Sequence, residues 1–454
     1  MRFLLIFPRF KYPSGDPPLG VAYVAAVLRE AGHEVEIFDA TFARRPLQAL
    51  EQQLKRSRYD LIGVSVMTSM LDAVAEVVRI CRQYSDAPIV AGGPHATVEP
   101  EGTLKIDGVD AVAVGEGESV TADLAAAGGS FADVPGIWYR QDGQIVQNAP
   151  AAPISDLDTV PFPARDLLDM QQYMALWYQL DAVKYGLRGT SVIGSRGCPY
   201  NCAYCQPTLR MIFGRQLRRR SPENIVAELE QLKREYNPDG VMWLDDTFLL
   251  DNGWMERLCG LLIEADLGIV WGCNVRADVA DKDTLALMQR AGLRIVHMGI
   301  ESASQRILDE VYQKGITIEQ VRGAVADAHS LGLKVRGYFM LGAPTETEEE
   351  LRQTVRLANE LPLDDVTFSI TTPLPHTHLY EQTQHLIARD FTEFDYYKTP
   401  VYETGATVSS RKLDWIKKSA YLQFYLGRKR LWRTVQSVLG VSGIKKMLLK
   451  VQRF

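Results

Sequence analysis

Three cysteines in one short loop constrain this chain more than any other feature. They are Cys198, Cys202 and Cys205, spaced Cys-x3-Cys-x2-Cys, and they follow an apolar run at residues 190–193. Short spacers that contain Pro and Asn let three thiolates converge on one inorganic centre. Closed zinc and iron–sulfur sites normally use four protein ligands, so three leave one metal position open to a small molecule. A zinc knuckle that lacks a ligand and a disulfide loop are the alternatives.

The composition is that of a soluble globular protein. The 454 residues are 46% hydrophobic and 23% charged, and a chain of this length is expected to form two domains and an extension. No apolar run is long enough for a membrane span, and residues 1–8 are expected to form a first strand, not a signal peptide. Six cysteines do not suggest a disulfide framework here, so a cytoplasmic location is expected.

Residues 1–145 alternate apolar runs with amphipathic helices, which predicts an α/β domain with a doubly wound parallel sheet. Strands are expected at residues 3–7, 34–39, 61–67, 89–91 and 111–114, and helices at 20–31, 47–57 and 70–84. Loops rich in small residues follow three of these strands, where such sheets bind ligands. The candidate residues in these loops are Ser65, Thr68, Gly92, Gly93, Pro94, His95, Gly115, Glu116, Gly117 and Glu118. The absence of a Gly-x-Gly-x-x-Gly fingerprint argues against a dinucleotide.

The rest of the chain predicts a linker, a barrel and an extension. Prolines and then aromatic residues mark residues 146–188 as a linker laid over a surface. Residues 189–385 predict a partial (β/α)6 barrel, in which five right-handed crossovers join six parallel strands. Strands are expected at 190–195, 241–244, 269–274, 295–300, 335–341 and 366–371, and helices at 222–236, 254–265, 282–291, 318–331 and 347–360. Residues 386–454 are expected to be a helical extension.

Polar residues fall at the carboxyl ends of the predicted barrel strands, where barrel enzymes carry their reactive groups. The set is Asp245, Asp246, Asn274, Arg276, Glu301 and Ser302. Carboxylates at this edge are suited to accept hydrogen bonds from an ammonium group. Arg276 is a candidate for binding a carboxylate, and a structural salt bridge with Asp278 or Asp245 is the alternative.

The cysteine spacing and the strand-end residues resemble the radical S-adenosylmethionine enzymes. The resemblance implies that the three cysteines hold a 4Fe–4S cluster whose fourth iron chelates S-adenosylmethionine. It implies further contacts to S-adenosylmethionine from the strand-end residues, with Glu301 on the ribose, and from Tyr204 and Met340. An electron from a flavodoxin- or ferredoxin-type donor would then generate a 5'-deoxyadenosyl radical that takes hydrogen from an inert carbon.

Residues 1–145 resemble the Rossmann-like cobalamin-binding domain that precedes the radical domain in one class of these enzymes. The loop of Ser65 and the Gly92-Gly93 pair would line the channel for the nucleotide tail, and residues 115–118 would close over the corrin edge. The Asp-x-His-x-x-Gly motif is missing, and residues 17–20 read Pro-Pro-Leu-Gly instead. A protein histidine on cobalt is therefore not expected. A flavodoxin-like domain that binds nothing is the alternative, and His95 either faces the ligand or is satisfied by backbone.

The resemblance implies a methyltransferase in which the barrel makes a substrate radical and methylcobalamin supplies the methyl group. One alternative is a non-methylating member, such as an oxidative cyclase or a ring-rearranging enzyme of tetrapyrrole or natural-product biosynthesis. Another is a non-catalytic sensor of cobalamin or S-adenosylmethionine. The expected substrate is a small or lipid-like molecule, and a nucleic acid is not expected because no basic–aromatic face occurs.

The basic residues are concentrated at one end of the chain. Residues 428–454 contain eight Lys and Arg and no acidic residue, against 42 Lys and Arg and 56 Asp and Glu in the rest. Apolar residues in this segment share one helical stripe, as in helices that lie on anionic membranes. A peripheral contact with the inner membrane surface is therefore one expectation. A helix that packs its stripe on the barrel is the other.

Overall fold

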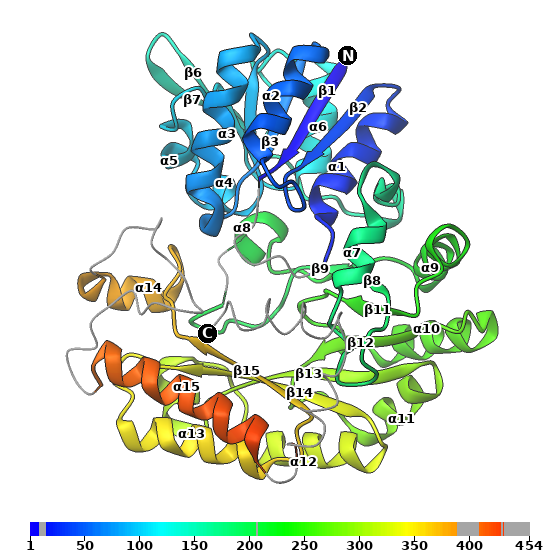
Figure 1. The fold of residues 1–454 in the computed structure, drawn as a ribbon, viewed down its shortest axis with the longest axis vertical. Coiled ribbons are helices and arrows are strands. Elements are labelled where there is room, and N and C mark those ends of the chain that lie inside the picture. Colours follow the sequence, from blue (N-terminus) through cyan, green and yellow to red (C-terminus); the bar gives the residue numbers. More distant parts are fainter. Residues whose placement is uncertain (9–14, 206–207, 388–407, 428–429, 431–454) are drawn as a thin grey trace. The chain divides into compact units, whose positions relative to one another are not determined.

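The computed structural model describes residues 1–8, 15–205, 208–387, 408–427 and 430. They form two compact units, each treated by itself below (Figure 1). The N-terminal unit contains residues 1–8, 17–172 and 208–218. The C-terminal unit contains residues 15–16, 173–205, 219–387, 408–427 and 430.

The N-terminal unit is built on a seven-stranded sheet of order β2-β1-β3-β4-β5-β6-β7. The strands are β1 (Arg2–Phe7), β2 (Glu34–Asp39), β3 (Leu61–Ser65), β4 (Ile89–Gly92), β5 (Ala111–Ala113), β6 (Ile137–Gln141) and β7 (Gln144–Gln147). The first five are parallel, which confirms the predicted sheet. The antiparallel hairpin of β6 and β7 was not predicted. Asp142 and Gly143, both with positive φ, form its two-residue turn, so the sequence did carry a hairpin signal that was overlooked.

Helices cover both faces of this sheet because side chains alternate along the central strand. In β1, Phe3 and Leu5 join the core under α1 and α6, whereas Leu4 and Ile6 join the core under α2 and α3. The helices of the unit are α1 (Leu19–Glu30), α2 (Pro46–Arg56), α3 (Leu71–Tyr84), α4 (Pro94–Val98), α5 (Pro100–Leu104), α6 (Gly117–Ala126), α8 (Thr208–Phe213) and the short turns η1 (Thr68–Met70), η2 (Leu157–Thr159) and η3 (Arg165–Leu167).

The C-terminal unit contains a six-stranded parallel sheet of order β15-β14-β13-β12-β11-β8. The strands are β8 (Gly189–Val192), β11 (Gly240–Trp243), β12 (Val270–Val275), β13 (Leu293–Glu301), β14 (Lys334–Leu341) and β15 (Asp365–Ile370). In Figure 1 the sheet curls, with its helices on the outer side. This arrangement confirms the predicted partial barrel and brings all six carboxyl ends to one rim.

Helix starts in this unit follow their capping residues, as the sequence indicated. The Ser221 hydroxyl accepts from the Asn224 amide, and Asp281 accepts from two amides of the first turn. The helices between strands are α9 (Pro222–Tyr236), α10 (Asn252–Ala265), α11 (Lys282–Arg290), α12 (Ile318–Ser330) and α13 (Glu348–Glu360). Smaller or flanking elements are α7 (Met170–Leu176), β9 (Ser195–Arg196), β10 (Arg218–Arg219), η4 (Ile307–Val311), α14 (His378–Thr383), η5 (Gln384–Leu386) and α15 (Ser410–Leu426).

The second half of the segment predicted as a linker is part of the barrel core. Trp177 is fully buried and packs with Leu180, Met242 and Ile295. The Asp16 carboxylate accepts from Ser191 Oγ at 2.6 Å and from Trp177 Nε1 at 3.2 Å. Trp177, within the segment predicted as a linker laid over a surface, is therefore part of the inside of the sheet. Proline spacing marked the segment as irregular but carried no information on what its aromatic rings would cover.

The predicted amphipathic helix within residues 428–454 lies outside the described residues, Arg430 excepted. Of the helices that the structure describes, none combines the length and apolar character needed to cross a bilayer.

Close packing at Gly189 generates the first prediction. A Cβ on Gly189 would lie 2.1 Å from Trp177 Cζ3 and 2.6 Å from Gly240 O. We expect Gly189→Ala to lower the free energy of unfolding by about 1–3 kcal/mol, because Trp177 must move. The matched control is Gly260→Ala in α10, where nothing lies within 4 Å of the added methyl, and where a gain of about 0.5–1 kcal/mol is expected. Thermal unfolding measures both, and equal midpoints for the two variants would contradict the packing.

Candidate active site

The cysteine loop begins directly after β9 at the rim of the barrel. Cys198, Cys202 and Cys205 are in no disulfide and are partly buried. Two backbone hydrogen bonds fix the middle of the loop, from Ala203 N to Tyr312 O at 2.8 Å and from Leu379 N to Ala203 O at 2.9 Å. The loop is therefore held by segments that are distant in sequence.

Two donors point at the cysteine sulfurs. The Thr247 hydroxyl donates to Cys198 Sγ at 3.0 Å, and Arg276 Nη1 lies 3.7 Å from Cys202 Sγ. Burial raises the pKa of the Cys202 thiol, while the positive charges of Lys314 and Arg276 act against that rise. The net rise keeps the thiol protonated while no metal is bound, and the two cations reduce the cost of ionising it when a metal binds.

Three thiols in one loop are the type of donor set that a 4Fe–4S cluster uses. Among the described residues, no three His, Cys, Asp or Glu side chains are grouped so that one ion could bind them all. In a 4Fe–4S cluster each thiolate binds a separate iron, so three thiols distributed along a loop suit it. None of the three is consumed by a disulfide.

Glu301 links the cysteine loop to the barrel. It ends β13 after a register shift, and its backbone takes the left-handed value φ 66°. Its carboxylate accepts from Lys314 Nζ at 2.6 Å and from Tyr204 OH at 3.1 Å. The side chains of Glu301 and Lys314 are only 9% and 6% exposed. A Cβ on Gly299 would lie 2.6 Å from Glu301 Oε1, so glycine makes room for the pair.

Asp245 and Asp246 at the end of β11 have different surroundings. Asp245 is buried and accepts from Gly194 N at 3.0 Å and Ser195 Oγ at 2.5 Å. Burial raises the pKa of Asp245 to about 6. Asp246 is open to solvent on one side, but the surrounding protein and the charge of Asp245 raise its pKa to about 7. Asn274 Nδ2 donates to Asp245 O at 3.2 Å. Asp245 thus supports the turn before the cysteine loop, and Asp246 is the carboxylate that a ligand can reach.

Arg276 adopts the salt bridge that was the alternative to ligand binding. Its Nε and Nη2 lie 3.0 and 3.1 Å from the two oxygens of Asp278. Its Nη2 also donates to Lys314 O at 2.9 Å, and the guanidinium lies 3.6 Å from the centre of the Tyr200 ring. The guanidinium therefore bonds to other groups of the protein, beside Cys202.

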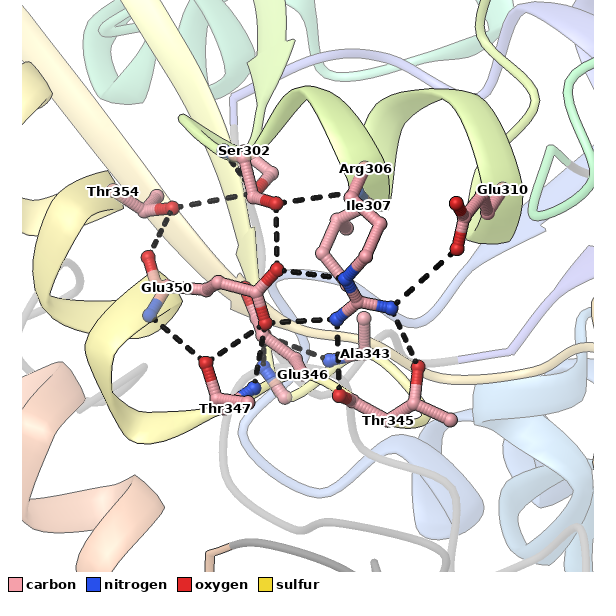
Figure 2. Close-up of polar contacts among 12 residues, drawn as sticks. Ser302, Arg306, Ile307, Glu310, Ala343, Thr345, Glu346, Thr347, Glu350 and Thr354 are labelled. Carbon is pink, nitrogen blue, oxygen red and sulfur yellow. Dashed lines mark hydrogen bonds and ion pairs between the residues drawn. The ribbon is translucent and has the colours of Figure 1, made fainter.

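Ser302 is not brought together with the other candidates. It is fully buried, its hydroxyl lies 3.3 Å from Thr354 Oγ1, and it accepts from Ser304 N at 3.1 Å. Figure 2 shows it in a network with Thr354 and Glu350 of α13, on the helix side of the sheet. Residues alternate sides along a strand, but the bulge at the end of β13 changes that alternation, which the sequence did not indicate. Met340 is half-buried in β14.

Three residues of the site were missed in the sequence. Thr247 and Lys314 lie in loops without a recognisable pattern. Glu346 is buried and accepts from Gly342 N at 2.7 Å and Ala343 N at 2.9 Å, which holds the turn after β14. Burial raises the pKa of Glu346 to about 8. A glutamate four residues after a turn glycine was the available signal for this one.

The loops at the carboxyl edge of the N-terminal sheet are bonded to one another. Thr68 Oγ1 lies 3.1 Å from His95 Nδ1, and Gly115 N donates to Thr97 Oγ1 at 3.1 Å. His95 is 5% exposed, and burial lowers its pKa to about 4. The imidazole is therefore neutral and lies against the Thr68 hydroxyl, a side-chain contact that neither of the two alternatives for His95 included.

Glycines keep this edge open. Gly93 and Gly115 have φ values of 101° and 103°, which other residues rarely adopt. A Cβ on Gly115 would meet nothing within 4 Å, and one on Gly92 would touch only Ala113. Backbone exposed in this way fits a bulky nucleotide-like group such as the tail of cobalamin. Ser65 and Pro94 flank these glycines at the end of β3 and the start of α4, and Gly117 begins α6.

The two acidic candidates of this edge are buried. Glu116 forms an ion pair with Arg218 at 2.8 Å and accepts from Ile154 N at 2.7 Å. Glu118 is 7% exposed in the first turn of α6. The structure thus gives Glu116 a role in holding the unit together, which its position after β5 did not reveal.

Two family models match the chain. The B12 binding domain matches residues 11–125, and the Radical SAM superfamily matches residues 192–358. The two matches fall on the two units described above.

Relatives and a solved structure match over most of the length. An uncharacterized methyltransferase of Pyrococcus horikoshii, PH0819, is 33% identical, covering 96% of this chain and 95% of that protein. The anaerobic magnesium-protoporphyrin IX monomethyl ester cyclase of Rubrivivax gelatinosus is 28% identical, covering 94% and 78%. The radical S-adenosylmethionine methyltransferase TsrM of Kitasatospora setae, solved with cobalamin and a 4Fe–4S cluster, has a TM-score of 0.72 at 21% identity, covering 86% and 76%. The last likeness shows the fold.

The Glu301–Lys314 pair generates the second prediction. Lys314→Met leaves the Glu301 charge buried without its cation, so we expect the free energy of unfolding to fall by about 3–5 kcal/mol. The control is Arg322→Met, which breaks the exposed pair with Glu360 and should cost under about 1 kcal/mol. Urea unfolding measures both. Equal losses would mean that the buried pair does not stabilise the site.

Proposed function

Since the chain belongs to the cobalamin-dependent radical S-adenosylmethionine enzymes, we propose that it is a methyltransferase acting on an unactivated carbon. Its cofactors are cobalamin, a 4Fe–4S cluster and S-adenosylmethionine. The observation that carries methyl transfer is the 33% identity, over nearly the whole length, to a protein named as a methyltransferase. The second candidate is oxidative cyclisation, which the 28% identity to the cyclase favours.

The chain's own residues bind and orient these groups. When bound, the cofactors supply a 5'-deoxyadenosyl radical and a transferable methyl group. Cys198, Cys202 and Cys205 are proposed as the three cluster ligands. Asp246 is proposed to accept from the methionine ammonium, because it is the accessible carboxylate of its pair.

Supporting residues keep the site in shape. Glu301 is proposed to contact the ribose with the carboxylate that also accepts from Lys314 Nζ. Glu346 holds the turn after β14, which is proposed to pack on adenine beside Met340. Asn274 and Asp245 brace the neighbouring turn. These roles require only small adjustments because each side chain is already held by the barrel.

The partners follow from the chemistry. The substrate is proposed to be a small or lipid-like molecule, and the electron donor a flavodoxin- or ferredoxin-type protein. No histidine of the protein is proposed to bind cobalt. The His95 imidazole lies at hydrogen-bond distance from the Thr68 hydroxyl, and residues 17–20 stand in place of the histidine motif.

Loss of one cysteine tests the enzyme assignment. Cys202→Ala should retain under about one-hundredth of 5'-deoxyadenosine formation, because two thiolates cannot hold a cluster with one open iron. Cys259→Ala, which changes a buried cysteine of α10, should keep iron content and activity. Full 5'-deoxyadenosine production by Cys202→Ala would refute the assignment. Product masses from extracts treated with the intact enzyme then separate the candidates, since methylation adds one methylene unit and cyclisation removes hydrogens.

The Thr247 hydroxyl generates a further prediction. Hydrogen bonds to cluster sulfurs stabilise the more negative, reduced state and raise the reduction potential. Thr247→Val keeps the shape but removes the donor, so the reduced-to-oxidised ratio at a fixed applied potential should fall roughly fivefold to tenfold. Thr247→Ser keeps the donor and should behave as the unaltered enzyme. A redox titration followed by electron paramagnetic resonance measures this, and an unchanged potential in Thr247→Val would exclude the role.

A further inference from the structure

Helix α15 carries an unusual exposed face. The described residues include six large hydrophobic side chains that are exposed, and three of them, Trp415, Leu422 and Leu426, lie on this one helix. They are 59%, 59% and 57% exposed. Their spacing of seven and four residues places them on one stripe, together with Arg411 and Lys418. We call these five residues the outer face of α15.

The opposite face anchors the helix firmly. Leu413, Ile416, Ala420 and Phe424 are buried in the barrel core. Tyr421 OH accepts from Phe368 N of β15 at 2.8 Å. A helix held in this way cannot rotate its apolar stripe inward, so the outer face stays exposed within the described part of the chain.

A hollow adjoins the outer face. It has a volume of about 630 Å³ and is lined from α15 by Leu422 and Leu426 and from α13 by Arg356, Asn359 and Glu360. The Glu360 carboxylate is paired with Arg322 at 2.8 Å. The hollow widens the apolar strip with polar groups at its rim, which is the layout of a surface that receives a partner with an apolar interior and a polar boundary.

Charge points to an anionic partner. Residues 410–454 contain twelve Lys and Arg and one acidic residue, Asp414, whereas residues 1–409 contain 38 Lys and Arg against 55 Asp and Glu. Asp414 is paired with Lys418 at 2.6 Å. The outer face therefore belongs to a strongly cationic part of an otherwise acidic chain.

We propose that the outer face of α15 docks on an anionic lipid membrane. Tryptophan and leucine flanked by Lys and Arg are the side chains of interfacial helices, in which aromatic rings and cations meet the headgroups and leucines enter the acyl boundary. A membrane satisfies both the apolar and the basic groups.

This contact does not depend on methyl transfer, and it indicates where a lipid-like substrate would be encountered. Each basic residue near an anionic surface contributes up to about 1 kcal/mol, and the contribution falls as salt rises. Binding should therefore require both the anionic lipid and the apolar side chains.

Flotation of the full-length holoenzyme with liposomes tests the proposal. We expect binding to vesicles of phosphatidylglycerol and phosphatidylcholine, and none to phosphatidylcholine alone. The triple variant Trp415→Ser, Leu422→Ser, Leu426→Ser should lose at least about tenfold in partitioning, since three interfacial side chains are removed. The matched control is Ile145→Ser with Ile263→Ser, which removes exposed apolar residues elsewhere and should bind as the unaltered protein.

The controls separate this proposal from the catalytic one. The triple variant should keep its iron content and 5'-deoxyadenosine formation, so lost flotation with retained activity supports the membrane contact alone. Flotation of the triple variant equal to that of the unaltered protein would overturn the proposal. A monomer–dimer shift in light scattering without lipid dependence would assign the face to a second copy. Stronger flotation after deletion of residues 431–454 would assign it to that segment.

Discussion

The buried pair of Glu301 and Lys314 is the contact on which the site depends. It joins the strained end of β13 to the loop after η4, and through the Tyr204 hydroxyl it reaches the cysteine loop. Gly299 provides the space, and Arg276 extends the same group through Lys314 O to Cys202. A charge buried to this degree is stable only with its partner present. The geometry of the loop is therefore set by the barrel, and a cluster would find its ligands already supported.

The architecture could be read from the sequence because periodicity determines it. Apolar runs of strand length separated by amphipathic helices, with capping residues such as Ser221 and Asp281, located all six barrel strands. The hairpin of β6 and β7 was missed because its short strands depart from the strand–helix alternation, although Asp142-Gly143 between them is a two-residue turn signal. Residues 146–188 were predicted as a linker laid over a surface, but Trp177 is buried in the space left by Gly189, a three-dimensional fact that spacing does not encode.

The sequence predicted which residues belong to the site better than it predicted how their side chains are oriented. Spacing alone identified the three cysteines, and strand ends identified Asp246 and Glu301 as candidates. The orientation of these side chains could not be predicted from the sequence. The side on which Ser302 lies is set by a bulge, and the orientation of Glu116 is set by an ion pair with Arg218, about a hundred residues away. Thr247 and Lys314 lie in loops, where neither periodicity nor a motif distinguishes a functional residue from a solvated one.

In the proposed methyl transfer, S-adenosylmethionine would be used twice, once as the source of the radical and once to remethylate cobalamin. Transfer of the methyl group leaves S-adenosylhomocysteine, and reductive cleavage leaves 5'-deoxyadenosine and methionine. Quantifying both products during turnover of the reconstituted enzyme with its substrate tests the claim most directly. The account predicts S-adenosylhomocysteine and 5'-deoxyadenosine in equal amounts. Continued formation of 5'-deoxyadenosine with no S-adenosylhomocysteine would contradict it and favour cyclisation.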